Sequence, residues 1–325
     1  MKKKTYSVII SILLLLVFAA ALIGRYSFSV DIREISKNRL LQDLILKVRL
    51  PRIAISLLVG AGLAVSGLVM QTIFQNPLAD PGVLGISQAA GFGAALGFLL
   101  FPTTQMPVQL FAFSCGIISL LVVLQLARMI NTSNRISLIF AGIAISAFFS
   151  AGLGIIKYLA DPLDQLPSIV FWLLGSLSTA NWQTVLQIAP ITIICLVILF
   201  LLRWRINVYA LNDSVLFSLG IRKNLEIYLI LGVSVLLTTT IISFSGLIGW
   251  VGLIIPNIAR LAYGYDLRRS LPAAMIVGAI FVLISDTIAR AAIAGEIPLG
   301  IITAFFGATV FVFLILKKRM FVGNG

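Results

Sequence analysis

Apolar runs of membrane-spanning length recur along almost the whole of this 325-residue chain. A helix needs about 20 consecutive apolar residues to cross a bilayer, and these runs lack the alternation that barrel strands require. Because 60% of the residues are hydrophobic and only 11% are charged, a water-soluble fold of this length would have to expose a largely apolar surface. The sequence therefore predicts an all-α polytopic membrane protein, with residues 1–325 forming a single transmembrane domain.

The basic residues between the apolar runs fit ten spans. Three lysines precede the first run and residues 317–319 are basic, so ten spans place both termini in the cytoplasm by the positive-inside rule. A retained first helix is favoured over a signal peptide, because the first run is long and no small-residue cleavage site follows it. All tryptophans and tyrosines fall at or beyond span ends, where interfacial aromatics belong. The predicted spans are residues 7–26, 52–75, 82–101, 107–128, 136–158, 184–204, 226–248, 250–262, 271–293 and 298–316.

One segment on the predicted outer side, residues 25–52, departs from the positive-inside rule because it carries seven basic residues. Its middle part, residues 33–47, is equally typical of a solvated amphipathic segment. Arg49 and Arg52 differ, because they flank Pro51 at a predicted helix start, where a rigid backbone can hold a guanidinium for bidentate pairing. These two arginines are therefore candidates for binding a carboxylate.

The second and third spans are rich in small residues at helical spacing. Ser56, Gly60 and Ala64 form one row, and Gly93 and Gly97 form a GxxxG pair. Rows of this kind let helices approach closely in lipid. Plain helix packing accounts for most of them, and a backbone-lined channel is the alternative.

A polar corner, Asn76 to Gly82, connects these two spans. Pro77 and Pro81 fix φ, Asn76 and Asp80 can cap a helix or form Asx turns, and Gly82 permits a strained turn. A simple connector would not need such rigidity. The sequence therefore predicts a shaped element at the cytoplasmic mouth.

Residues 207–224, after the sixth span, form the clearest element outside the membrane. Asn212 or Asp213 suits an N-cap, apolar residues line one side of the short helix that follows, and Gly220 suits the C′ position. We predict a short cytoplasmic helix that either lies on the membrane surface or docks in the groove of a partner.

Two features of the later spans are unusual in lipid. The segment from Gly246 to Arg260 is short, glycine-rich and broken by Pro256, which is typical of transporter pathways. Asp286 is the one acid well inside a predicted span, and such acids are functional by default. Arg290 lies one helical turn along the same face, so a self-neutralising structural pair is the equal alternative.

The composition excludes several classes of function. The chain contains no histidine, which removes HExxH zinc sites, Ser-His-Asp triads and imidazole relays; a metal cargo would have to arrive inside a chelator. Cys115 and Cys195 lie in apolar runs without a CxxC partner and are expected to be small buried hydrophobes, not metal ligands. The net charge of +13 is distributed in short loop clusters, which indicates membrane topology rather than nucleic-acid binding.

Six motifs follow one another along nearly the whole chain: RLPR at 49–52, QNPLADPGVLGIS at 75–87, FWLLGSLS at 171–178, GLIGWVGLIIPNIARL at 246–261, SDTIAR at 285–290 and EIPLGIITAFFGATVF at 296–311. In this order they resemble the iron-siderophore, haem and vitamin B12 ABC importer permeases, the FecCD-type transmembrane subunits with type II importer architecture. In that family a histidine commonly stands where this chain has Asn257, so no role that needs an imidazole is expected there.

The resemblance implies roles for individual residues. It assigns Arg49, Arg52 and Arg290 to docking of an extracytoplasmic substrate-binding protein through carboxylates on its lobes. It implies a cytoplasmic gate at Asn76, Leu78, Thr132 and Ser133, and coupling to the ATPase through Asp213, Leu216, Leu219, Gly220 and Ile221.

The resemblance also implies a non-catalytic subunit in the cell membrane that binds no cofactor of its own. Its expected partners are a second permease subunit, identical or a sister chain, two cytoplasmic ATPase subunits that use ATP, and the binding protein. The absence of a Walker A motif agrees with ATP hydrolysis by a separate chain. A ferric siderophore is the expected cargo, with haem or cobalamin as alternatives and an ion-coupled secondary transporter as a distant one.

Overall fold

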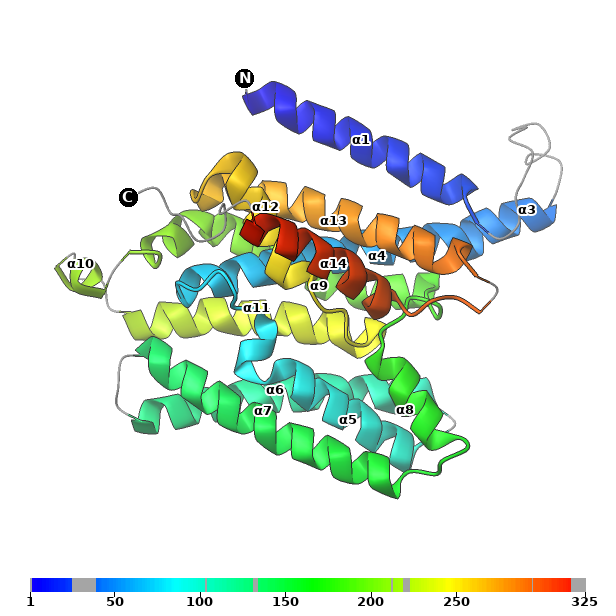
Figure 1. Ribbon diagram of the computed structural model, residues 1–325, viewed down its shortest axis with the longest axis horizontal. Coiled ribbons are helices and arrows are strands. Elements are labelled where there is room, and N and C mark those ends of the chain that lie inside the picture. The colour runs from blue at the N-terminus through cyan, green and yellow to red at the C-terminus, as the bar shows by residue number, and fades with distance from the viewer. Residues whose placement is uncertain are drawn as a thin grey trace.

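The structure, a computed structural model, describes residues 2–24, 39–102, 104–130, 134–211, 213–218, 223–293 and 295–316. Every regular element within these ranges is helical (Figure 1), which confirms the prediction of an all-α fold. The elements are α1 (Lys2–Leu22), α3 (Arg39–Asp43), the π-helix η1 (Leu44–Arg49), α4 (Leu50–Ile73), the 3₁₀-helix η2 (Pro81–Leu84), α5 (Ile86–Leu100), α6 (Gln105–Ile130), α7 (Asn134–Leu159), α8 (Gln165–Leu173), α9 (Trp182–Val208), α10 (Asp213–Ser218), α11 (Lys223–Ser245), α12 (Val251–Tyr263), α13 (Leu267–Ala291) and α14 (Leu299–Leu316).

A helix stands at each of the ten predicted spans. Among the described residues, seven helices are long and apolar enough to cross a membrane, judged by length and composition. The shorter apolar helices are Ser7–Leu22, Ile86–Leu100 and Val251–Tyr263. The third span begins at Ile86 rather than at residue 82, because Pro81–Leu84 forms the separate turn η2.

The central helix of the fold is α4. Together with α3 and η1 it forms one continuous helix, Arg39–Ile73, and 83% of its most apolar stretch is buried inside the protein. The helices α9, α11, α12 and α13 pack around α4. A span this enclosed is shielded from lipid by its neighbours.

The glycines of α4 are contact points with other backbones. A Cβ atom on Gly60 would lie 2.2 Å from the carbonyl oxygen of Gly278 in α13, and one on Gly67 would lie 1.9 Å from that of Gly252 in α12. On α5, a Cβ on Gly93 would lie 2.3 Å from the carbonyl oxygen of Phe111 in α6. Helix packing therefore explains these small residues, and the alternative of a channel lined by them is wrong.

The predicted helix start at Pro51 coincides with the start of α4 at Leu50, but α4 follows η1 without a break, so that Arg39–Ile73 is one continuous helix. Proline has no N–H and cannot donate to the carbonyl of Lys47 one turn earlier. The backbone widens at this point into the π-helix η1. Arg49 ends η1 and Arg52 lies in the first turn of α4, and both side chains are buried.

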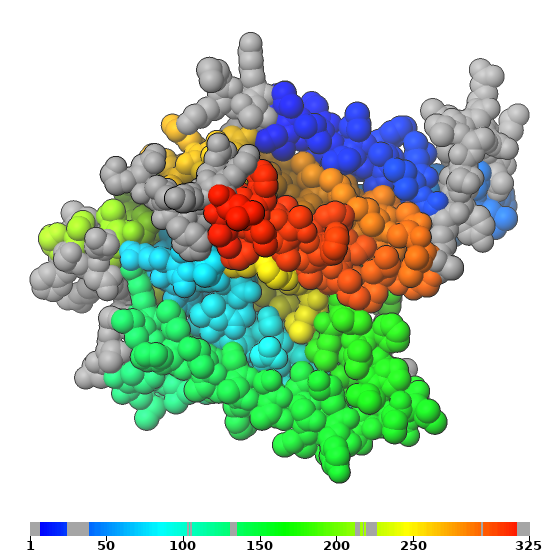
Figure 2. Space-filling model, in the orientation of Figure 1, coloured from blue at the N-terminus to red at the C-terminus, as the bar shows by residue number. Residues whose placement is uncertain are grey.

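The helices run roughly parallel and fall into two groups. In Figure 1, α5, α6, α7 and α8 lie on one side of α11, and α4, α9, α12, α13 and α14 lie on the other. The side chains of α1 rest along α13 at the edge of the second group (Figure 2). The start of α1 and the end of α14 share one end of the molecule with α10; we call this the inner end, and the opposite one the outer end.

Candidate functional site

A buried ion cluster lies at the outer end. The Arg52 guanidinium donates through Nε to both carboxylate oxygens of Asp286, at 2.9 and 3.1 Å, and through Nη1 to Glu296, at 3.0 and 3.1 Å. Asp286 is 0% exposed, and its Oδ2 lies 3.8 Å from Nε of Arg290. These residues, together with Arg49, form what we call the outer arginine cluster.

The same cluster caps the outer end of α1. Arg49 donates through Nη1 to the carbonyl oxygens of Ala21 and Leu22, both at 2.8 Å, and Arg290 donates to that of Ala20. The last carbonyls of a helix have no partner within the helix and carry its negative dipole end, so a guanidinium suits them. Two arginines from distant segments thus hold α1 against α4 and α13.

The structure brings together the three arginines that the resemblance assigns to docking, but their side chains are covered. Arg49 is 5% exposed, Arg52 7% and Arg290 8%. The main partner of Asp286 is Arg52, 234 residues away, rather than its helix neighbour Arg290. Sequence reasoning missed Glu296, although this residue opens one of the quoted motifs, because nothing local marks it as a partner of Arg52.

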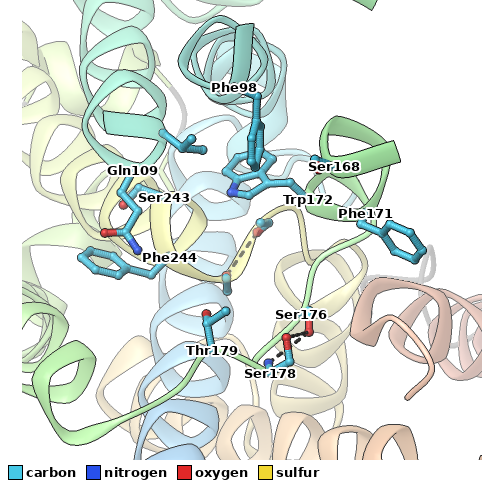
Figure 3. A pocket seen from close by; sticks show the side chains of 13 residues that line it. Phe98, Gln109, Ser168, Phe171, Trp172, Ser176, Ser178, Thr179, Ser243 and Phe244 are labelled. Carbon is cyan, nitrogen blue, oxygen red and sulfur yellow. Dashed lines mark hydrogen bonds between the residues drawn. The ribbon is translucent and has the colours of Figure 1, made fainter. Parts of the chain in front are cut away.

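An open pocket of about 290 Å³ also lies at the outer end of the molecule. Figure 3 shows Phe98 and Trp172 next to each other, with the hydroxyl-bearing Ser176, Ser178 and Thr179 across the pocket from them. All thirteen lining residues are uncharged: Phe98, Val108, Gln109, Ser168, Phe171, Trp172, Ser176, Ser178, Thr179, Ser243, Phe244, Ser245 and Gly246. No local sequence pattern predicts this pocket, because its walls come from α5, α6, α8, α11 and a loop.

The loop that forms one wall of the pocket is fixed on two sides. The Ser176 amide donates to the carbonyl oxygen of Ser245 at the end of α11, at 2.8 Å, and the Leu299 amide donates to that of Gly175 at 2.9 Å. Gly175 has φ of 70°, a value that glycine adopts at no steric cost. Because α14 begins three residues after Glu296, the same short segment joins the pocket wall to the outer arginine cluster.

At the inner end, the predicted corner is a hydrogen-bonded turn. The side-chain oxygen of Asn76 accepts from the Leu78 amide at 2.9 Å, an Asx turn of the predicted kind. Leu78 is 43% exposed. The left-handed residues that turn the chain are Gln75 (φ 50°) and Gly85 (φ 74°); Gly82, predicted to take the strained position, lies inside η2 instead.

The corner faces α7 across a cavity of about 310 Å³ that Asn76 lines together with Ile139, Ile143 and Ser146. The other two predicted gate residues, Thr132 and Ser133, lie outside the described residues. Asn134, the next residue, begins α7. The structure thus places Asn76 beside α7, the helix that begins directly after Thr132 and Ser133.

A short junction, residues 209–211, connects the corner to the predicted coupling helix. Gln75 donates to the carbonyl oxygens of Ala210 and Leu211, at 3.0 and 2.8 Å, and Arg135 at the start of α7 donates to that of Tyr209 at 2.7 Å. The helix α10 begins two residues later at Asp213, where the sequence predicted a helix start.

The predicted coupling residues are described only in part. Leu216 of α10 is 0% exposed and anchors the helix in the core, while Val215 is 41% exposed. Leu219, Gly220 and Ile221 lie outside the described residues. The anchored position of Leu216 means that movement of α10 would be transmitted to the core that contains α4.

The Asn257 side chain has no ionisable group and acts as a hydrogen-bond donor. Its amide donates to the carbonyl oxygen of Pro77 in the corner, at 3.0 Å, and to that of Leu253, at 2.7 Å. One turn later, Arg260 donates to Gln71 at 2.8 Å and to Thr72 at 3.0 Å. These side chains hold α12 against the inner end of α4.

A second brace at the inner end joins α9 to α13. The Asn207 amide donates to Asp266 at 2.7 Å, and the Asn207 side-chain oxygen accepts from the Leu267 amide at 2.8 Å. Asp266 also caps α13 by accepting from the Arg268 amide at 2.9 Å. Hydrogen bonding from Arg268 lowers the pKa of Asp266 to about 2, so this brace is ionised at neutral pH.

The described residues contain no group of three or more histidine, cysteine or acidic residues that could hold a metal ion. Cys115 and Cys195 are free thiols; Cys195 is buried as expected, whereas Cys115 is only partly buried. What the geometry can provide is an ion cluster and an uncharged pocket at one end, and a corner linked to a small helix at the other. A helical membrane protein with these features is suited to moving a solute rather than transforming it.

Comparison with known proteins agrees with this class. Residues 11–317 match the FecCD transport family. The chain is 37% identical to the molybdate import system permease protein MolB of Haemophilus influenzae, over 96% of both chains. It is 40% identical to a probable iron chelatin transport system permease protein of Helicobacter pylori, over 86% of this chain and 84% of that one. A solved structure, described as an inward-facing conformation of an ABC transporter, is 36% identical with a TM-score of 0.90, and the match covers 97% of this chain and 99% of that chain.

The chain is thus a multi-pass transmembrane permease subunit of an ABC importer. It belongs to the FecCD transport family. In this class ATP is hydrolysed by separate ATPase subunits, so the chain is not itself an enzyme.

Proposed function

We propose that this permease imports a ferric siderophore or a closely similar ferric chelate, and that the outer pocket receives part of it. The observation that carries the proposal is the uncharged lining of that pocket. A chelator presents an organic, largely apolar surface with carbonyl and hydroxyl groups to the protein. Aromatic faces such as Phe98 and Trp172, and hydroxyls such as Ser176 and Thr179, match such a surface.

The size of the pocket also indicates that it binds only one part of a larger ligand. Its volume of about 290 Å³ is at the lower limit of pockets for drug-sized molecules, and it would hold one arm of a chelate while the remainder lies in the path between two permease subunits. Molybdate is the second candidate cargo, since the Haemophilus influenzae relative matches almost end to end. An oxyanion is usually bound with the help of cationic side chains, and none of the residues that line this pocket is charged.

The cargo is tested with the assembled transporter, reconstituted in vesicles with its ATPase and binding protein. We expect ATP-dependent uptake of a ⁵⁵Fe-loaded siderophore, and none of ⁹⁹Mo-molybdate. Thr179→Trp, which fills the pocket from an exposed position, should lower siderophore uptake at least tenfold, whereas Thr179→Ser should not. Uptake of molybdate alone, or full siderophore uptake by Thr179→Trp, would contradict the proposal.

We further propose that Arg49, Arg52 and Arg290 dock the binding protein by exchanging partners. In this conformation Arg49 and Arg290 donate to the neutral carbonyls that end α1. A carboxylate on an incoming partner would make stronger, charge-assisted hydrogen bonds with the same guanidinium groups. Docking at the cluster would then loosen the outer end of α1 and act directly on α4 and α13.

Arg49→Gln tests this docking role without adding a negative charge. Glutamine retains an NH₂ group for the α1 carbonyls but loses the charge that a carboxylate requires, so we expect the affinity for the binding protein to fall about tenfold, or about 1.4 kcal/mol. Affinity is measured by surface plasmon resonance on the detergent-purified transporter. Arg39→Gln, at an exposed position farther out on the same continuous helix, is the matched control. Equal affinities for Arg49→Gln and wild type would rule the role out.

At the inner end, we propose that the corner with Asn76 and Leu78, and the loop with Thr132 and Ser133, form the cytoplasmic gate. The segment from Asp213 to Ile221 would couple this gate to the ATPase. The proposal is supported by the 209–211 junction, which bonds to the corner through Gln75 and to α7 through Arg135. A push on α10 would therefore reach both sides of the gate through the hydrogen bonds that the Gln75 and Arg135 side chains donate to the junction carbonyls.

A further inference from the structure

A third cavity, distinct from the outer pocket and from the cavity beside the corner, lies between α9 and α13. Its volume is about 480 Å³, and its lining is entirely apolar: Ile193, Leu196, Val197, Phe200, Pro272, Met275 and Ile276. Ile193 and Val197 are about half exposed on the face of α9. The cavity is therefore a groove that opens to the surroundings of the helix bundle, which in a membrane are lipid chains.

The groove and the helical turn that follows it together have the length of one membrane leaflet. Its α9 residues span Ile193 to Phe200, and Arg203 follows one turn later. At 1.5 Å per residue, Ile193 to Arg203 covers about 15 Å, which is half of a hydrocarbon core about 30 Å thick. Trp204, 59% exposed, lies at the same level, where tryptophan marks the membrane interface.

The inner end of the groove is basic. The Arg203 guanidinium carbon lies 3.9 Å from the centroid of the Phe200 ring, the last groove residue on α9. On α13, Arg268 and Arg269 precede Pro272 by one helical turn, so they lie on the same helix face and nearer the inner end. We call Arg203, Arg268 and Arg269 the basic rim.

The hydrogen bonds between Asn207 and the start of α13 hold the two helices that carry the basic rim side by side. Asn207 of α9 bonds to Asp266 and to the Leu267 amide, which places the end of α9 beside the start of α13. Asp266 is also the acid that faces the rim, and it is paired with Arg268 at 3.1 Å. With three arginines and one aspartate, the rim keeps a net positive charge.

We propose that this groove binds an anionic phospholipid of the inner-end leaflet, with one acyl chain between α9 and α13 and the phosphate at the basic rim. The apolar walls match the chain in chemistry, and the distance from Ile193 to Arg203 matches it in length. The charge of the rim selects a headgroup that carries net negative charge, as basic pockets between helices at the cytoplasmic face do. By bridging α9 and α13, the lipid would strengthen the brace at Asn207 and Asp266.

Binding is measured on the full-length chain, purified in detergent, by native mass spectrometry during titration with phosphatidylglycerol or with phosphatidylcholine. We expect one phosphatidylglycerol to bind at least tenfold more tightly than phosphatidylcholine. Arg203→Gln combined with Arg269→Gln should lower the affinity for phosphatidylglycerol about tenfold. Arg128→Gln, an exposed position at the inner end of α6, controls for general attraction by charge.

The chain part of the site is tested separately by Val197→Trp, which fills the groove from an exposed position, with Val197→Phe as a milder substitution in case the first variant is unstable. Either should reduce bound phosphatidylglycerol at least fivefold while the protein stays monodisperse in gel filtration. Three results would overturn the proposal: equal affinity for the two lipids, an effect of Arg128→Gln as large as that of the rim variant, or unchanged binding in both groove variants.

Discussion

Replacing Arg52 with alanine will destabilise the protein by about 3–5 kcal/mol, the cost of removing one partner from a buried ion pair. Asp286 is 0% exposed and receives two hydrogen bonds from Arg52. Arg290, with its Nε 3.8 Å away, is too distant to replace them. The expected result is a large fall in the thermal midpoint of the detergent-purified protein, measured by tryptophan fluorescence.

The matched control is Lys47→Ala. Lys47 pairs with Asp43 at 3.0 Å on the same continuous helix, but its side chain is 70% exposed, so its loss should cost at most about 1 kcal/mol. A combined Arg52→Met and Asp286→Leu variant removes both charges and should regain most of the lost stability. If Arg52→Ala behaves like Lys47→Ala, the ion pair does not stabilise the fold, and Asp286 would need another explanation.

The double variant also separates two roles of the outer arginine cluster. If Arg52 acts only within the fold, the restored protein should transport normally. If Arg52 also receives a carboxylate from the binding protein, the restored protein should be stable and yet impaired in uptake. The sequence left the structural and functional interpretations of Asp286 and Arg290 open, and this comparison decides between them.

The sequence was sufficient to predict the helices, because each helix corresponds to a local pattern of hydrophobic residues. The ten runs, the interfacial aromatics and the start of α10 at Asp213 all follow from neighbours within a few residues. The irregularity at Pro51 also lies where the sequence predicted it, at the junction of η1 and α4, but the helix is not interrupted there. Proline disfavours a regular α-helix locally, but packing of the continuous helix Arg39–Ile73 against its neighbours overrides that preference.

The candidate sites were harder to predict, because their partners lie far apart in the chain. The carboxylates that bind Arg52 are more than 200 residues away, and no periodicity connects them. The outer pocket joins residues from Phe98 to Gly246, none of which is chemically distinctive alone. Family motifs located the arginines and the corner, but they could not show that Arg49 and Arg290 also hold the end of α1.

Replacing Gly67 with alanine will have the second large effect, because the new methyl group meets a backbone and not a side chain. Its Cβ would lie 1.9 Å from the carbonyl oxygen of Gly252, so α12 must move away from α4. Overpacking of this kind costs about 3 kcal/mol. The displacement would also stretch the bonds from Asn257 to Pro77 and from Arg260 to Gln71, now 3.0 and 2.8 Å long.

The consequence for function is a misplaced corner, since Asn257 connects α12 to the turn that carries Leu78. We therefore expect Gly67→Ala to lower the thermal midpoint and, in reconstituted vesicles, to separate ATP hydrolysis from uptake. Gly232→Ala on α11 is the control, because a Cβ there meets nothing within 4 Å. That substitution should be neutral or stabilising by up to about 1 kcal/mol, as expected for alanine in a helix interior. Equal stability of the two variants would show that α4 and α12 are not tightly packed at Gly67. The proposal that α12 positions the corner through Asn257 would then be contradicted.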